Sequence, residues 1–382
     1  MTYSEEFAKI VEEQLARVAN MKACSEKTDF ANKEKIIIGT IDGDGIGPVI
    51  MDSCRAVLQK LLADEIASGK IELRRIEGLT LENRVAKMQA VPEDVLAEIK
   101  KCDVLLKGPT TTPGKGTRLP GSGDEVPNLP SANVTLRREL DLFANVRPVT
   151  IPEKNISWTF YRENTEGEYA LGSRGVDISD DISIDFKVTT TQGTKRLARA
   201  AFEYAKNNGN LNVSIVTKAN IMKKTDGKFL SLCMEVADNY PDIKVDDWYV
   251  DIMAANLIND DINSNFNVFI LPNLYGDIIT DEAAQMQGGV GTAGSSNIGD
   301  RYAMFEAIHG SAPRMVEEGI AEYANPASIN RAAVMMLRHM GFSNKADLLE
   351  SAIDAAAGAL DLPGDGTGNT AADFTEFVLA RI

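Results

Sequence analysis

The chain alternates short apolar runs with longer segments in which apolar residues recur every three or four positions. The first pattern predicts buried strands, and the second predicts helices that cover them. Such an alternation is typical of an α/β protein with a largely parallel sheet. The paired runs and helical segments are KIIIGTID before 48–64, DVLLKGP after 91–101, SIVTKA before 226–239, and NVFILPN before 277–287.

Two segments depart from this pattern. Residues 108–130 are so rich in glycine and proline that they predict a long loop, and loops of this length are usually functional or disordered. Residues 171–190 alternate polar and apolar positions, which predicts antiparallel strands. The second segment could be an arm that pairs with another chain.

The first 18 residues predict an acidic amphipathic helix with Phe7, Ile10, Val11 and Leu15 on one side. The segment resembles neither a secretory signal nor an arginine-rich transit peptide. No apolar run in the sequence approaches the roughly 20 residues of a membrane span. We therefore expect a cytoplasmic protein.

Composition excludes several classes of function. The 382 residues carry a formal net charge of −16, which argues against binding a nucleic acid through the general surface. Four scattered cysteines argue against a disulfide scaffold or a thiolate metal site, and two histidines exclude a multi-histidine site. Any metal should therefore be a hard cation held by carboxylates, such as Mg²⁺ or Mn²⁺.

The stretch GTIDGDGIGP looks at first like the phosphate-binding turn of a dinucleotide-binding fold, because a strand, three glycines and a helix follow one another. The motif fails at its last glycine, since Pro48 follows Gly47. No acidic residue closes a second strand about 20 residues further on, as the ribose contact of that fingerprint requires. We interpret residues 43–47 as a tight strand-to-helix turn at the edge of a pocket.

Arginines and polar residues gather in PSANVTLRRELDLFANVRPV, residues 130–149. Ser131 and Asn133 open a predicted helix that carries Arg137, and Arg147 follows in a strand-like segment. Arginine is suited to bidentate binding of carboxylates. The alternative is that Ser131 only caps the helix and that the arginines are solvated.

Further candidates for acid–base chemistry follow two other strands. FYRENTEGEYA places Arg162 and Tyr169 after an apolar run, and Lys218 stands at the end of SIVTK. Open α/β sheets present ligand-binding groups at such strand ends. The alternatives are an ordinary charged loop and a solvated lysine.

Three aspartates are candidates for a metal site. Asp251 follows a predicted strand, and Asp277 and Asp281 stand at helical i, i+4 spacing on one face. A shared cation would explain two like charges in this arrangement, although aspartate also favours helix N-termini. Of the two histidines, His309 lies in a glycine-rich loop and is the better candidate for a ligand contact, whereas His339 is expected on a helix surface.

Together these stretches resemble the isocitrate and isopropylmalate dehydrogenase family of metal-dependent decarboxylating dehydrogenases. The resemblance runs from about residue 35 to the C-terminus and rests on GDGIG, RENTEGEY, NLYGDIITD and EAIHGSAP, in the family's order. It implies an α/β fold that is not a Rossmann fold. A large, mostly parallel cofactor-binding domain (1–142 and 288–382, with 1–34 a helical extension) is expected beside a smaller substrate and dimerisation domain (143–287) with a strand-rich clasp at about 171–190.

The resemblance favours isocitrate as the substrate, because Ser131-x-Asn133 followed by Arg137 is similar to the isocitrate pattern. Isopropylmalate enzymes place leucines on this helix. Homoisocitrate differs by one methylene, worth only about 1–3 kcal/mol, and stays an alternative together with isopropylmalate and tartrate. An isocitrate substrate implies oxidative decarboxylation to 2-oxoglutarate and CO₂, a reaction of the tricarboxylic acid cycle.

The resemblance also assigns roles to these residues. It implies Tyr169 and Lys218 as the catalytic proton-transfer residues. It implies substrate binding by Ser131, Asn133, Arg137, Arg147 and Arg162, and metal binding by Asp251, Asp277 and Asp281. The implied cofactor contacts are Ile46, Thr111, Thr112, His309, Gly310, Ser311, Ala312, Arg314 and Asn325.

The implied cofactor is NADP, with NAD as the alternative. NAD-using relatives tend to have aspartate where this chain has Arg314, and arginine suits a 2′-phosphate. Glu317 and Glu318 follow closely, and their charge would oppose a phosphate.

By family analogy Lys218 and Asp251 reach into the site of another subunit, which predicts a homodimer with shared active sites. Two alternatives compete with an enzyme. A regulatory subunit of the family would typically have lost a catalytic lysine, tyrosine or metal aspartate, and all are present here. An unrelated α/β nucleotide-binding module would make the carboxylates and arginines coincidental.

Overall fold

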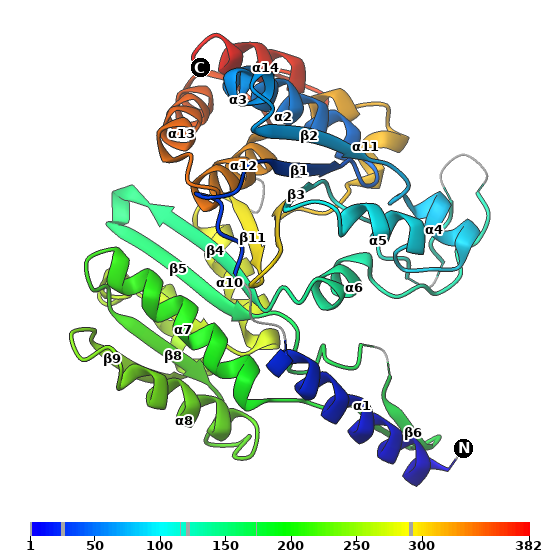
Figure 1. The fold of residues 1–382 in the computed structure, drawn as a ribbon, viewed down its shortest axis with the longest axis vertical. Coiled ribbons are helices and arrows are strands. Elements are labelled where there is room, and N and C mark those ends of the chain that lie inside the picture. Colours follow the sequence, from blue (N-terminus) through cyan, green and yellow to red (C-terminus); the bar gives the residue numbers. More distant parts are fainter. Residues whose placement is uncertain (1, 24–26, 115, 120–122, 173, 290–292) are drawn as a thin grey trace. The chain divides into compact units, whose positions relative to one another are not determined.

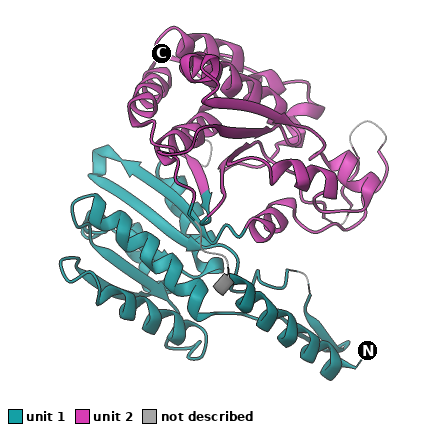
Figure 2. Ribbon diagram, in the orientation of Figure 1, with its two compact units in different colours: residues 1–27, 141–287, 297–300 teal, residues 28–140, 288–296, 301–382 magenta. Residues whose placement is uncertain are grey.

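A computed structural model describes residues 2–23, 27–114, 116–119, 123–172, 174–289 and 293–382. The chain forms two compact units, each assembled from segments that are distant in sequence (Figure 2). Unit 1 comprises Met1–Lys27, Asp141–Gln287 and Asn297–Asp300, and unit 2 comprises Thr28–Leu140, Gly288–Ser296 and Arg301–Ile382.

Unit 2 is built on parallel strands in the order β2, β1, β3, β12 (Figure 1). These strands are β1 Ile36–Ile41, β2 Ile71–Ile76, β3 Val104–Lys107 and β12 Ala303–Ala307. Its helices are α2 Gly47–Leu61, α3 Ala63–Ala67, α4 Leu81–Lys87, α5 Glu93–Ile99, α6 Ala132–Glu139, α11 Pro313–Glu317, α12 Ala327–His339, α13 Ser343–Ala359 and α14 Ala371–Leu379, with a 3₁₀ turn at Ala321–Tyr323. Strand β11, Gly294–Ile298, has residues in both units.

Unit 1 carries strands in the order β4, β5, β10, β8, β9. The β4–β5 pair is antiparallel and the other pairs are parallel. The strands are β4 Ala144–Ile151, β5 Ile156–Glu163, β8 Val213–Thr217, β9 Val245–Tyr249 and β10 Val268–Leu271. The helices are α1 Tyr3–Ala23, α7 Thr191–Asn207, α8 Asp226–Ala237, α9 Val250–Leu257 and α10 Asn273–Met286, with 3₁₀ turns at Pro152–Lys154 and Asn263–Asn265.

Helices cover both faces of the unit 1 sheet. Leu197 of α7 and Phe229 of α8 pack with Ile215 on one face. Met253 of α9 and Ile279 of α10 belong to the apolar cluster on the other face. Because side chains of successive strand residues point to opposite faces, the continuous apolar runs reflect burial on both sides.

The expected fold class is confirmed. The sheet strands are mostly parallel, and residues 171–190 contain a small antiparallel ribbon of β6 (Val176–Ser179) and β7 (Ile182–Ile184). The described residues of 108–130 form a loop whose single strand-like contact is a bridge between Arg118 and Glu125. No helix within the described residues is long and apolar enough to cross a membrane.

The N-terminal helix forms but belongs to a different unit from the one expected. Residues 1–27 were predicted in the large domain with 28–142, whereas they group with unit 1. The reason is that α1 packs on α7 and β6, with Ile10 buried against Leu171 and Val176. The rest of the predicted apolar side is exposed: Phe7, Val11 and Leu15 keep 51%, 40% and 65% of their surface.

Helix α10 begins earlier than predicted. The expected helix was 277–287, whereas α10 starts at Asn273, directly after Pro272. Its first turn includes Gly276, a weak helix former that hid the start of the helix from the sequence pattern. Both Asp277 and Asp281 therefore lie within the helix rather than at its start.

Candidate active site

The GDGIG motif forms a tight turn between β1 and α2, as expected. Gly43 and Gly45 have φ values of 74° and 60°, a region that glycine enters at no steric cost. A Cβ on Gly43 would lie 2.0 Å from the carbonyl oxygen of Pro109, and one on Gly45 would lie 1.9 Å from that of Ser311. The glycines therefore let three backbone segments of unit 2 approach one another, which explains them without a bound phosphate.

Asp44, in the middle of this motif, ties the turn to its neighbours. Its two carboxylate oxygens accept hydrogen bonds from the backbone N–H groups of Leu81 and Thr111, both at 2.7 Å. Burial raises the pKa of Asp44, and the two N–H donors oppose that rise. Sequence reasoning passed over this residue, although an acidic side chain between two glycines was the available signal.

Several predicted cofactor contacts meet beside this turn. The backbone N–H of Ile46 donates to the carbonyl of Ser311 at 3.0 Å, and the hydroxyls of Thr111 and Ser311 lie 2.7 Å apart. A cavity of about 1070 Å³ is lined by the glycine turn, Thr111 and Val316, among other residues of unit 2. A cavity of this size is large enough for a cofactor.

His309 and Asn325 lie on loops of the same unit. His309 Nδ1 lies 3.0 Å from the carbonyl oxygen of Gly310, and its Nε2 is buried without a hydrogen-bond partner among the described residues. Burial lowers the pKa of His309, which favours the uncharged ring. Asn325 accepts from the backbone N–H of Ala327 at 2.9 Å, at the start of α12. Thr112 is exposed.

Ala312 directly precedes α11, and Arg314 lies in its first turn. Ala312 has a φ of 43°, a conformation in which L-residues are rarely found. Arg314 extends into solvent, with 85% of its side chain exposed, and its Nε lies 2.6 Å from Glu318 one helical turn on. The guanidinium charge is already balanced by this carboxylate. The geometry therefore gives no support to Arg314 as a contact of a 2′-phosphate.

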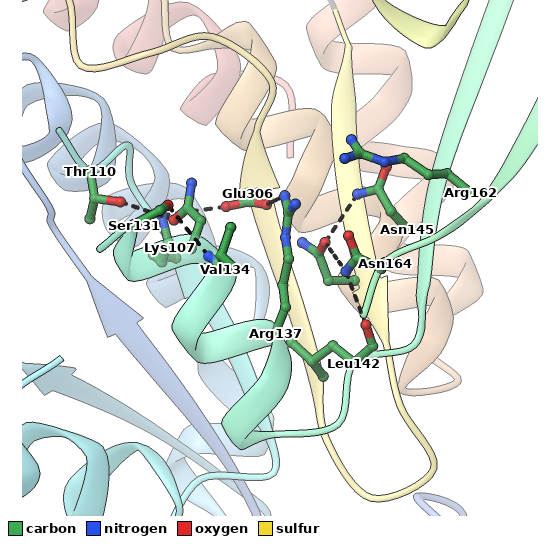
Figure 3. Close-up of polar contacts among 12 residues, drawn as sticks. Lys107, Thr110, Ser131, Val134, Arg137, Leu142, Asn145, Arg162, Asn164 and Glu306 are labelled. Atoms are coloured by element: carbon green, nitrogen blue, oxygen red, sulfur yellow. Dashed lines mark hydrogen bonds and ion pairs between the residues drawn. The ribbon is translucent and has the colours of Figure 1, made fainter. Parts of the chain in front are cut away.

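The start of α6 carries the predicted polar substrate contacts (Figure 3). The Ser131 hydroxyl accepts from the Val134 N–H at 3.4 Å, so Ser131 caps the helix. The Asn133 side-chain oxygen accepts from the Thr110 hydroxyl at 2.9 Å. Capping and substrate binding do not exclude each other, because a hydroxyl can donate while it accepts.

Two charged residues that sequence reasoning missed lie beside Arg137. Its Nη2 is 3.2 Å from Glu306 Oε1, and Lys107 Nζ is 3.4 Å from Glu306 Oε2 (Figure 3). Lys107 is fully buried at the end of β3, and this burial lowers its pKa. The signals were charges inside the apolar runs DVLLKGP and YAMFEAIHG.

In unit 1, two arginines face two aspartates. Arg147 of β4 and Arg162 of β5 lie on adjacent antiparallel strands, and α10 packs on both. Arg147 Nη1 is 2.6 Å from Asp281, and Arg162 forms an ion pair with Asp277. The i, i+4 spacing on α10 thus matches the spacing of the two arginines across the strands.

Tyr169 joins this group. Its hydroxyl donates to Asp277 Oδ2 at 2.9 Å, and the Arg162 guanidinium lies 5.4 Å from the centre of its ring. Unit 1 therefore brings together five of the predicted residues, from three different elements and one loop. They are Arg147, Arg162, Tyr169, Asp277 and Asp281.

Lys218 and Asp251 pair with each other. Lys218 directly follows β8 and Asp251 lies in the first turn of α9, and their Nζ and Oδ1 atoms are 2.6 Å apart. The hydrogen bond from Lys218 lowers the pKa of Asp251. More than half of the Asp251 side chain is exposed, at 57%. The backbone N–H of Lys218 is held by buried Asp226 at 2.8 Å.

Within the described residues, no three histidine, cysteine, aspartate or glutamate side chains come close enough to hold one metal ion. Asp251 is therefore not a third ligand beside Asp277 and Asp281 in the same chain. The expectation that Asp251 acts in the site of another subunit stays a prediction.

Comparisons with known proteins agree with these observations. A family profile described as isocitrate/isopropylmalate dehydrogenase matches residues 37–378. The chain is 38% identical over 353 residues to a Macaca fascicularis protein named isocitrate dehydrogenase [NAD] subunit alpha, mitochondrial, which covers 90% of this chain and 94% of that protein. It is also 38% identical over 323 residues to isocitrate dehydrogenase [NAD] subunit 2, mitochondrial, of Schizosaccharomyces pombe, covering 82% of this chain and 78% of the relative.

The fold is shared with solved structures. The crystal structure of isocitrate dehydrogenase from Methylococcus capsulatus matches with a TM-score of 0.75 and 32% identity, over 91% of this chain and 99% of that chain. With the family's motifs, fold and paired arginines and aspartates all present, this chain belongs to the isocitrate/isopropylmalate dehydrogenase family.

Proposed function

We propose that this protein catalyses the oxidative decarboxylation of isocitrate to 2-oxoglutarate and CO₂, with NAD as the hydride acceptor. The main support for this proposal comes from the side-chain N–H groups of two buried arginines. The Nε atoms of Arg137 and Arg147 are buried and have no hydrogen-bond partner within the part of the chain that the structure describes. An unpaired buried donor costs about 1–3 kcal/mol, and a ligand carboxylate would remove that cost.

Isocitrate is favoured over isopropylmalate because the start of α6 is polar. The hydroxyl of Ser131 and the amide of Asn133 suit an additional carboxylate, and an isobutyl group would leave these groups unpaired. The relatives described above carry the name isocitrate dehydrogenase. Homoisocitrate and tartrate-type substrates are the alternatives that an assay must separate.

A divalent cation, Mg²⁺ or Mn²⁺, is proposed to bind Asp277 and Asp281. Their oxygen donors on one face of α10 suit a hard cation, and Asp251 of a second subunit would complete the set of carboxylates. The cation would lower the pKa of the substrate hydroxyl and stabilise negative charge on its oxygen.

Lys218 and Tyr169 are proposed to move the protons. Lys218, from a second subunit, would accept the proton of the C2 hydroxyl, and the cofactor would supply the hydride acceptor for the same carbon. The resulting β-keto acid loses CO₂, and Tyr169 then donates a proton to C3. The 2.9 Å hydrogen bond from the Tyr169 hydroxyl to Asp277 supports its role beside the metal-binding residues.

NAD is proposed in place of the NADP expected from the sequence. Both relatives described above carry [NAD] in their names. The Arg314 side chain extends into solvent and pairs with Glu318, so its geometry does not favour a 2′-phosphate contact. Unit 2 is proposed to bind the cofactor, through Thr111 in the lining of the cavity described above and through Ile46 and Ser311 beside it.

The assembly is proposed to be a homodimer with shared active sites, with the β6–β7 ribbon of unit 1 as the clasp between subunits. The relatives are named as subunits, so a hetero-oligomer with a second type of chain is the alternative. A regulatory subunit without turnover is less favoured, because Tyr169, Lys218 and all three aspartates are present. The cytoplasmic location expected from the sequence stays a prediction.

Initial rates test the proposal. Isocitrate, homoisocitrate, isopropylmalate and tartrate are each supplied with NAD or NADP, with Mg²⁺ or with EDTA. We expect turnover of isocitrate with NAD and its loss in EDTA. Turnover that persists in EDTA would contradict the metal assignment, and a preference for isopropylmalate would contradict the assignment of Ser131 and Asn133.

A further inference from the structure

Arg17 of helix α1 forms an ion pair with a buried carboxylate of unit 1. Arg17 Nη2 lies 3.0 Å from Glu166 Oε1, and only 3% of the Glu166 side chain is exposed. The same carboxylate accepts hydrogen bonds from the backbone N–H and the hydroxyl of Thr190, the residue that caps α7. A buried carboxylate that loses its counter-ion is strongly unfavourable. Arg17 therefore helps to determine where the Glu166 side chain rests.

A second buried carboxylate makes this counter-ion more important. Glu163 is 2% exposed, and it accepts a hydrogen bond from the backbone N–H of Glu166 at 2.6 Å. The charge of the Glu166 carboxylate raises the pKa of Glu163, because two like charges repel each other in a medium of low dielectric constant. The charge of Arg17 offsets part of that repulsion.

The main chain of Glu166 is connected to Arg162 through Asn273, the first residue of α10. Asn273 Nδ2 donates to the Glu166 carbonyl at 3.0 Å, and its Oδ1 accepts from Arg162 Nε at 3.0 Å and Nη2 at 2.7 Å. Asn273 and Arg162 are each 1% exposed. The amide therefore holds the guanidinium in the orientation in which Nη1 pairs with Asp277.

Glycines occur where these side chains pass closest to other segments. A Cβ at Gly193 of α7 would lie 2.4 Å from Glu166 Oε1, and a Cβ at Gly276 of α10 would lie 2.5 Å from Arg162 Cγ. Packing this tight leaves little room for either side chain to adopt another rotamer. A displacement of Glu166 should therefore also shift Asn273 and Arg162.

We propose that Arg17 is a positioning residue for substrate binding. Through Glu166 and Asn273 it holds Arg162 in the orientation that binds a substrate carboxylate. The inference rests on the proposed function, because it takes Arg162 as a carboxylate ligand. The N-terminal helix would thus affect substrate binding although none of its residues contacts the substrate.

The test compares two arginines of unit 1 that form ion pairs involving α1. Arg17→Met, in the full chain, removes the cation beside buried Glu166. Arg174→Met is the matched control, because Arg174 pairs with Glu13 of α1 at 2.7 Å on the exposed surface. We expect Arg17→Met to raise the KM for isocitrate about three- to tenfold while the KM for NAD stays within about twofold. Arg174→Met should change neither value, and Arg17→Lys should recover part of the loss.

A double variant tests the route through Glu166. In Glu166→Gln the carboxylate charge is absent, so adding Arg17→Met should raise the KM for isocitrate by less than it does in the wild-type background. If the two substitutions raise the KM independently, so that their fold-changes multiply, the connection through Glu166 is overturned. An unchanged KM in Arg17→Met would overturn it as well, and so would equal increases in Arg17→Met and Arg174→Met.

Failure of the proposed function would look different. If the wild-type enzyme does not turn over isocitrate, the proposed function is wrong, and the connection is judged from a crystal structure of Arg17→Met. Loss of either hydrogen bond from Arg162 to Asn273 in that structure would support the positioning role. Retention of both would overturn it.

Discussion

Glu163 is a buried carboxyl group whose ionisation should affect the stability of the protein. Burial raises its pKa to about 7, and the carboxylate of Glu166 adds to the rise. A carboxyl group with a higher pKa in the folded state than in the unfolded chain binds its proton more tightly when folded. Its contribution to stability is therefore present below the unfolded pKa of about 4.3 and is lost as the pH rises through 7.

We accordingly expect the wild-type protein to lose stability relative to Glu163→Gln between pH 5 and pH 8. The expected relative loss is roughly 1–3 kcal/mol, since each pKa unit is worth about 1.4 kcal/mol. Urea unfolding midpoints of both proteins at the two pH values measure it. A constant difference between the two midpoints across this range would contradict the raised pKa of Glu163.

A second prediction at this scale concerns Arg314, which is exposed and paired with Glu318. Arg314→Ala should leave the KM for NAD within about twofold of the wild-type value, because an exposed ion pair contributes little free energy. Steady-state kinetics with NAD and NADP provide the measurement. A KM for NADP that starts low and rises more than about tenfold in the variant would instead identify Arg314 as a phosphate contact.

At the scale of elements, α10 carries both proposed metal-binding aspartates and depends on a glycine. Gly276→Ala would place a Cβ 2.5 Å from Arg162 Cγ, so either the helix or the arginine must move. We expect a loss of about 1–3 kcal/mol in unfolding free energy. We also expect a lower kcat/KM for isocitrate, because Arg162 would leave its position.

Gly227→Ala is the matched control for that variant. Gly227 lies in α8, and a Cβ there would meet nothing within 4 Å. Its replacement should be neutral or stabilise the protein by up to about 1 kcal/mol, because alanine favours a helix. Equal losses in the two variants would show that glycine is needed in these helices for a reason other than Arg162.

At the scale of the whole molecule, the assembly of subunits can be tested. Lys218 pairs with Asp251, and no three carboxylates form a metal site among the described residues. If each active site takes Tyr169 from one chain and Lys218 from its partner, inactive Tyr169→Phe and Lys218→Met proteins should complement each other. If subunits exchange at random, about half of the dimers are hybrids that contain one chain of each variant. Each hybrid has one intact site out of two, so about one quarter of the wild-type activity should return.

The measurement is the isocitrate-dependent rate after the two variants are denatured and refolded together. Differently tagged subunits, purified on both tags in turn, verify that hybrids form. Hybrids without activity would place both residues in the site of their own chain.

The order of strands and helices was largely predictable from the sequence. Apolar periodicity is a local property, so β1, β3, β8 and β10 appear where the runs predict them. The exceptions are also local in origin. Gly276 concealed the first turn of α10, and of the four apolar residues predicted on one side of α1 only Ile10 is buried.

The motifs identified the family and the residue types of the site, because chemistry such as carboxylate binding restricts which side chains can serve. Only the tertiary structure decided which of them meet. Arg162 and Asp277 are 115 positions apart, and buried Lys107 reaches Glu306 only because β3 and β12 pair. The need for glycine at Gly43 and Gly45 of GDGIG was likewise explained only by the structure, because backbone segments from elsewhere in the chain approach these positions closely. Such contacts depend on the packing of elements far apart in sequence, which no local pattern encodes.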